Sequence, residues 1–126
     1  MKRIITPLLL LASLSSCYND KADLLYPPDP CRVDTVTYSG TVSPILVTNC
    51  ATANGCHKSK SVDPSNATVV ELDQFAGAKA IADNGKLLGV INHTTGFAQM
   101  PKNMSKLDDC TIRKISKWVA DGAPQN

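Results

Sequence analysis

An all-α fold is predicted by three features of the amino-acid sequence. Apolar residues recur at helical spacing, most clearly near the C-terminus at Ile112, Ile115 and Trp118. No stretch of useful length alternates apolar and polar residues, as a half-buried strand would. Residues that begin or end helices flank each apolar segment, and no internal repeat is visible. We therefore expect a small helical domain whose helices are separated by loops.

The first two helices are expected on either side of a long loop. One begins at Ser43-Pro44 and leads to Cys50, because serine can cap free amides and proline fits the first helical turn. Residues 58–70 are polar and contain turn formers, which indicates a loop. Asp73 is then expected to cap a second helix that Asn84-Gly85 breaks.

Two further helices complete the prediction. The third runs from about Lys86 to His93 and carries apolar residues at helical spacing, namely Leu87, Leu88 and Ile91. The fourth is the clearest: Asp108 or Asp109 caps it and Gly122 ends it. Its basic residues are expected to face water.

The N-terminus has the composition of a secretory signal. Residues 1–16 combine a short basic start, an apolar stretch and a small-residue end. The tail Leu14-Ser15-Ser16-Cys17 resembles the lipobox of bacterial lipoprotein precursors, which implies cleavage before Cys17 and acylation of that residue. The alternative is an ordinary signal cut nearby, which would leave Cys17 as a spare thiol.

The rest of the chain is expected to form a tether and one domain. Residues 17–34 are rich in proline and fit a lipid-anchored tether, and residues 35–126 fit a single helical domain. No later stretch is apolar enough to cross a bilayer, so lipid alone would attach the protein to the membrane. We expect a bacterial cell-envelope location, with the domain in the periplasm or at the cell surface. Tyr18, where an inner-membrane retention signal has aspartate, favours the outer membrane.

Charge argues against a nucleic-acid partner. The full sequence has a formal net charge of +2, and Lys2 and Arg3 in the signal account for this excess. The mature chain would therefore carry equal numbers of basic and acidic side chains, with no surplus to neutralise phosphates.

A candidate cofactor site lies in the run from Cys50 to His57. Two thiols, Cys50 and Cys56, stand beside a histidine with the spacing C-x5-C-H, whereas the haem-attachment signature is C-x-x-C-H. Thiols can add across porphyrin vinyl groups, and a neutral imidazole can bind iron. The alternative is a surface disulfide between the two cysteines with an incidental histidine.

Met100 is the candidate for the second axial ligand. Pro101 disfavours helical backbone at the residue before it, so Met100 is expected in a loop, where its thioether can point inward. A thioether ligand raises the reduction potential of haem. The alternative is a half-buried loop methionine without a ligand role. Met104 and His93 are lesser candidates, and His93 is expected to cap a helix or face solvent.

Taken together, these segments resemble the class I cytochrome c domain. The resemblance is closer to small haem-c lipoproteins and planctomycete-type cytochrome c modules, and it covers most of residues 38–123. The residues that carry it, in chain order, are Pro44-Ile45-Leu46, Asn49-Cys50, Gly55-Cys56-His57, Gly85-Lys86-Leu87-Leu88, Ile91, Met100-Pro101, Leu107, Ile112, Ile115, Trp118 and Gly122-Ala123.

The resemblance implies one covalently bound haem c. Cys50 and Cys56 would form thioether links, His57 would be the proximal ligand and Met100 the distal ligand. The five-residue spacer leaves open whether one or two thioether links form. The helix that carries Trp118 would pack on the helix before Cys50. With Cys17 acylated and two cysteines linked to haem, Cys31 and Cys110 would remain as a disulfide pair, although four thiols allow three pairings.

An iron with both axial positions closed favours one-electron transfer over enzymatic chemistry. We expect a membrane-tethered electron carrier, or a haem subunit that docks on envelope redox proteins, with no small-molecule substrate pocket and no nucleophile–base pair. Two alternatives belong to other classes. One is a five-coordinate haem enzyme or sensor, and the other is a haem-free lipoprotein binding module stapled by Cys50–Cys56 and Cys31–Cys110.

Overall fold

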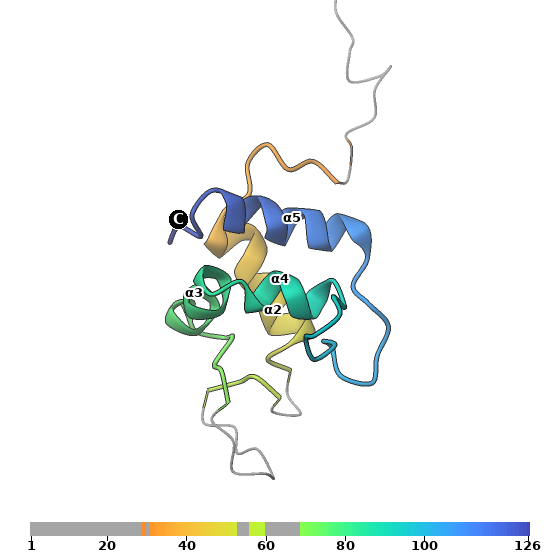
Figure 1. The fold of residues 1–126 in the computed structure, drawn as a ribbon. Helices are drawn as coiled ribbons and strands as arrows, with labels where there is room; N and C mark the ends of the chain where they lie inside the picture. Colours follow the sequence, from red (N-terminus) through yellow and green to blue (C-terminus); the bar gives the residue numbers. More distant parts are fainter. Residues whose placement is uncertain (1–28, 30, 53–55, 60–68) are drawn as a thin grey trace, which may run out of the picture.

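The computed structural model describes residues 29, 31–52, 56–59 and 69–126, and within these residues it is helical without strands. The elements in chain order are η2 (Tyr38–Val42), α2 (Ser43–Asn49), α3 (Phe75–Asp83), α4 (Lys86–Ile91) and α5 (Asp109–Ala120) (Figure 1). The all-α prediction is confirmed for this part of the chain. The predicted signal, the acylated Cys17 and most of the tether lie outside the described residues.

The first helical unit begins earlier than the sequence predicts. Residues 38–42 form a π-helical turn, η2, that runs directly into α2. Thr37 caps this turn, because its Oγ1 accepts a hydrogen bond of 3.1 Å from the backbone N–H of Gly40. Ser43 is therefore already helical and is not the cap. Pro44 lies in the first turn of α2, as predicted.

The second and third helices have different ends from those predicted. Gln74 occupies the N-cap position of α3 without a side-chain cap bond, so the prediction that Asp73 caps this helix is wrong. The reason is tertiary: the Asp73 carboxylate accepts hydrogen bonds from Ser59 instead. Helix α4 ends at Ile91 with Asn92 as its C-cap, so His93 lies beyond the helix.

Both ends of the last helix, α5, lie where the sequence predicts them. Asp108 is the N-cap of α5, and its Oδ1 accepts from the backbone N–H of Thr111 at 2.9 Å. After the helix, Gly122 adopts a φ of +88°, a left-handed conformation that glycine tolerates without strain. The chain then folds back, so the indole Nε1 of Trp118 donates to the Pro124 carbonyl at 2.9 Å.

The core lies where the two ends of the domain meet. Its largest fully buried side chains come from α2 and its preceding turn, from α4 and from α5: Val42, Leu46, Leu87, Ile91, Ile115 and Trp118. Trp118 packs on Tyr38, with ring centroids 5.5 Å apart. Helix α5 thus packs on the helical unit before Cys50, as expected, but mainly through η2. The C-terminal Asn126 strengthens this closure by accepting from the backbone N–H groups of Tyr38 and Ser39.

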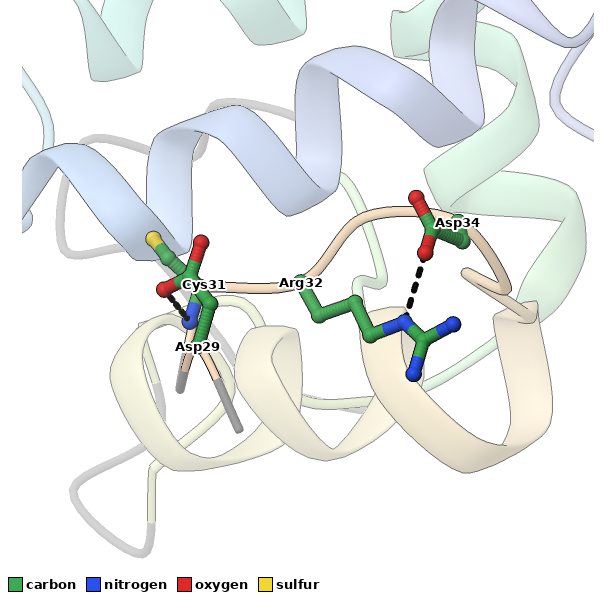
Figure 2. Close-up of polar contacts among 4 residues, drawn as sticks. All are labelled: Asp29, Cys31, Arg32 and Asp34. Atoms are coloured by element: carbon green, nitrogen blue, oxygen red, sulfur yellow. Dashed lines mark hydrogen bonds and ion pairs between the residues drawn. The ribbon is translucent and has the colours of Figure 1, made fainter. Parts of the chain in front are cut away.

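A disulfide ties the N-terminal arm to α5. Cys31 is bonded to Cys110, which confirms the expected pairing. Figure 2 shows the arm, where the Asp29 side chain accepts from the backbone N–H of Cys31 at 2.8 Å. Further along, Arg32 and Asp34 form an exposed ion pair, which contributes little to stability. In Figure 1 the arm runs along α5 before it enters η2.

Within the described residues, no helix has the length and apolar character needed to cross a bilayer.

Candidate functional site

The end of α2 positions the first candidate thiol. Cys50 follows the last helical residue, and its N–H donates to the Leu46 carbonyl at 2.8 Å. Ala51 next to it is buried in the core. The Cys50 carbonyl in turn accepts from the backbone N–H of His57 at 3.1 Å. This bond places the backbone of His57 next to Cys50, at the C-terminal end of α2.

Both thiols of this segment are free. Cys50 is half-buried and Cys56 is exposed, and neither is in a disulfide. Burial, with a smaller contribution from the nearby Cys56 thiol, raises the pKa of Cys50 to about 11. Cys50 is therefore a neutral thiol at physiological pH, with little of the thiolate that disulfide exchange requires. The segment before His57 therefore carries two unpaired thiols.

A single hydrogen bond decides which nitrogen of His57 can bind a metal. Its Nδ1 lies 3.1 Å from the backbone carbonyl oxygen of Val70. A carbonyl can only accept, so Nδ1 must carry the proton in this contact. In the neutral ring, Nε2 then presents its lone pair, and this arrangement is the usual one for metal-binding histidines.

The backbone around His57 is held on both sides. The His57 carbonyl accepts from the N–H of Leu72 at 2.7 Å. Ser59 lies two residues after His57. Its N–H and its Oγ both donate to Oδ1 of Asp73, at 2.9 and 2.8 Å. Desolvation would raise the pKa of Asp73, but the hydrogen bonds from Ser59 outweigh it and lower the pKa. The segment 57–59 is thus fixed to residues 70–73, just before α3.

Met100 belongs to the loop between α4 and α5, as predicted. It is half-buried, and the peptide bond to Pro101 is cis. Its N–H donates to the Val90 carbonyl at 3.1 Å, and its own carbonyl lies 3.1 Å from Nε2 of His93. The loop is therefore attached to the C-terminal end of α4 at the candidate ligand itself.

The other candidate ligands are less suited to iron. Met104 is 69% exposed, so little around it would fix its thioether. His93 closes the C-terminal end of α4, as expected, with a φ of +56° and an N–H that donates to the Val90 carbonyl at 3.3 Å, and its Nε2 also lies 3.1 Å from the Met100 carbonyl. The two histidines thus differ: among the described residues, the contact of His57 is made by Nδ1, whereas that of His93 is made by Nε2.

The structure joins some of the predicted residues and not others. The backbone hydrogen bond between His57 and Cys50 joins the two ends of the segment that contains Cys56. A separate backbone bond joins Met100 to Val90 of α4. No hydrogen bond links His57 to Met100 in the described part of the chain. In the view of Figure 1, the segment after α2 and the loop after α4 both extend below α4.

The candidate ligands do not form a cluster of metal-binding side chains in the described part of the chain. Residues 29, 31–52, 56–59 and 69–126 contain no group of three or more His, Cys, Asp or Glu side chains arranged to hold an ion. Haem brings four nitrogen ligands of its own and needs only two axial ligands from the protein. The residues that could hold such a group are His57, whose Nε2 is left unprotonated by the Nδ1 contact, the loop residue Met100 and the free thiols of Cys50 and Cys56.

Three features near this site were missed by sequence reasoning. They are the Asp73–Ser59 contact, the His93–Met100 contact and the packing of Phe97 on Gly89. Each joins residues through tertiary structure, and no spacing rule in the sequence signals it.

Comparisons of the chain with protein-family models, with curated proteins and with solved structures found no match.

Proposed function

We propose that this chain is a membrane-tethered c-type cytochrome that transfers one electron at a time through a single covalent haem. Cys50 and Cys56 would hold the haem by thioether links, and His57 and Met100 would be its axial ligands. The observation that carries the proposal is the hydrogen bond from Nδ1 of His57 to the Val70 carbonyl, because it leaves Nε2 available for iron.

The thiols and the histidine act together in this proposal. Cys50 and Cys56 are free, and the bond from the His57 N–H to the Cys50 carbonyl keeps the backbones of these two residues together. A bound haem would supply a reversible one-electron couple between ferric and ferrous iron. The chain would orient the imidazole through Val70 and fix the segment through the Asp73–Ser59 contact.

Met100 would determine whether the site transfers electrons or catalyses a reaction. Its thioether would close the second axial position, which leaves no site for oxygen or peroxide and favours electron transfer over catalysis. A thioether also raises the reduction potential. The carrier would then need a partner that docks on it, which we propose to be an envelope redox protein or an enzyme complex of which this chain is the haem subunit.

The proposed location depends on Cys17. Acylation there would attach the protein to a bacterial envelope membrane, with the outer membrane favoured, and residues 17–34 would act as a tether that the Cys31–Cys110 disulfide fixes to the domain. The domain would lie in the periplasm or at the cell surface. The Cys31–Cys110 disulfide supports this location, because structural disulfides persist in oxidising compartments.

The ligand assignment is tested with two methionine variants of the full-length protein. Met100→Ala should lower the reduction potential and allow carbon monoxide to bind the reduced haem without prior denaturation. Met104→Ala is the matched control, because this methionine is exposed in the same loop. It should behave as the parent protein does. Equal spectra and potentials for parent and Met100→Ala would show that Met100 is not a ligand.

The same experiment separates the two alternatives. A five-coordinate haem protein would bind carbon monoxide in the parent form, before any substitution. A haem-free module would be colourless in every variant. That module also requires a Cys50–Cys56 disulfide, whereas both thiols are free in the structure.

A further inference from the structure

The chain reverses direction just after α4, at His93. This residue adopts a φ of +56°, in the left-handed region that glycine occupies readily and that histidine, asparagine and aspartate occupy more often than other residues do. The next residue, Thr94, donates its N–H to the Gly89 carbonyl at 3.0 Å and closes the turn. The reversal leaves the imidazole half-buried between α4 and the loop that carries Met100.

Two hydrogen bonds hold Met100 from opposite sides of its Cα atom. Its N–H donates to the Val90 carbonyl at 3.1 Å, and its carbonyl accepts from Nε2 of His93 at 3.1 Å. Because a carbonyl can only accept, the Nε2 of His93 carries the proton. Fixing both peptide groups of one residue also fixes the direction of its Cα–Cβ bond, and therefore the region that its thioether can reach.

This arrangement matters because a thioether is a neutral ligand with no charge to hold it at iron. Its occupancy of an axial position depends on how well the protein holds it there before and after iron changes oxidation state. The bond to Val90 is a backbone bond that α4 supplies. The bond from His93 is the contact that depends on the identity of a side chain.

We propose that His93 is a positioning residue for Met100, holding its carbonyl so that the thioether points to the haem. This inference rests on the function proposed above and deepens it, because it assigns to the second histidine a role other than iron ligation. His93 acts on the iron only through Met100.

The test uses three variants of the full-length protein. His93→Asn and His93→Gly remove the imidazole but keep residues that tolerate a left-handed backbone. Asn103→Gly is the matched control, since Asn103 has a φ of +58° in the same loop and donates no hydrogen bond to Met100. Two readouts are compared with the parent protein. One is the weak absorption band at the red end of the ferric spectrum that reports sulfur bound to iron, and the other is hydrogen exchange of the Met100 amide.

Both His93 variants should weaken the sulfur-to-iron band and lower the reduction potential. They should also raise the exchange rate of the Met100 amide roughly fivefold, because the loss of the bond to the Met100 carbonyl loosens the loop and lets the bond from the amide to Val90 open more often. Asn103→Gly should leave the band and the exchange rate unchanged. A reduction potential that falls in both His93 variants but not in the control would support a positioning role over a general loss of stability.

The possible failures are distinguishable. If the parent protein shows the band and both His93 variants keep it together with the parent exchange rate, the inference is wrong and the proposed function stands. If Asn103→Gly loses the band as well, the effect is not specific to His93 and the inference is also wrong. If the parent protein carries no haem, the proposed function is wrong, and the positioning role falls with it.

Discussion

The ring of Phe97 lies directly against Gly89 on α4. A Cβ atom at position 89 would stand 2.6 Å from two carbons of this ring, closer than atoms can approach without displacement. Gly89 is buried in the helix, whereas Phe97 is 42% exposed on the loop that carries Met100. The missing side chain at 89 therefore allows the loop to pack on α4 close to the candidate ligand.

Gly89→Ala should displace the Phe97 ring and loosen this loop. Overpacking typically costs about 1–3 kcal/mol, and alanine recovers about 1 kcal/mol through its better helix propensity. We expect a net loss of about 1 kcal/mol in the free energy of unfolding, measured by urea denaturation. In the haem-loaded protein, the reduction potential should also fall.

A second substitution supplies the control for the clash. Phe97→Ala in the Gly89→Ala background removes the ring that the new Cβ would meet, so the two changes should be non-additive. A double variant less stable than the sum of the single effects predicts would contradict the packing described here.

The Asp73–Ser59 contact should be required for a firmly held His57. Asp73→Ala leaves the N–H and Oγ of Ser59 without their acceptor, so hydrogen exchange of the Ser59 amide should rise several-fold. The fraction of protein that carries haem should fall as well. Exchange rates are measured by mass spectrometry, and the haem fraction by absorbance per chain.

Asp83→Ala is the matched control for this substitution. Asp83 pairs with Lys79 at 2.5 Å on the exposed face of α3 and has no contact with residues 56–59. Surface pairs of this kind contribute little. Equal haem fractions for the two variants would argue against a role for Asp73 in the site.

The N-cap of α5 should make stability depend on pH in the acid range. Hydrogen bonds from the hydroxyl and the N–H of Thr111 lower the pKa of Asp108 below its ordinary value of 3.8. The charged carboxylate is therefore favoured in the folded state. Its contribution is fully present above pH 3.8 and is lost as the pH falls through the lowered folded-state pKa.

Urea denaturation at successive pH values tests this dependence. Asp108→Asn keeps an oxygen that can cap the helix but removes the titration, so its stability should decline less steeply below pH 3.8. Asp109→Asn is the matched control, because it removes the same charge in the same turn without removing a cap bond. Identical declines for Asp108→Asn and the parent protein would show that the cap does not contribute in this way.

The predictions from sequence succeeded where a local pattern controls the outcome. Helix α5 has one apolar face and an N-cap whose partner is three residues away, and both of its ends agree with prediction. The Asp73 prediction failed because its partner, Ser59, is 14 residues away in the chain. The early start at Tyr38 was missed because no apolar periodicity marks a π-helical turn.

The candidate site was predictable in residue type but not in orientation. Spacing singled out Cys50, Cys56, His57 and Met100 without reference to the fold. The protonation of His57 at Nδ1 depends on a backbone carbonyl at Val70, a group that every residue possesses and that no sequence pattern identifies. The contact of His93 with the Met100 carbonyl, on which its proposed role rests, likewise depends on where the chain reverses after α4.

The disulfide should provide a large share of the stability of the domain. It joins residues 79 apart in sequence, and closing a loop of this length is worth about 4 kcal/mol on the chain-entropy account. Cys31→Ala combined with Cys110→Ala should lower the free energy of unfolding by about that amount. The parent protein under reducing conditions should match the double variant. A loss below about 1 kcal/mol would contradict a stabilising role.

The most direct test of the central claim is an alkaline pyridine spectrum of the full-length protein, taken after a denaturing gel stained for haem. We predict that the chain keeps its haem through denaturation and gives the spectrum of a thioether-linked haem, whose band position shows whether one or both of Cys50 and Cys56 are attached. The mass should equal that of the mature chain with its lipid and one haem. A colourless chain with a mass equal to that of the chain and lipid alone would contradict the proposal.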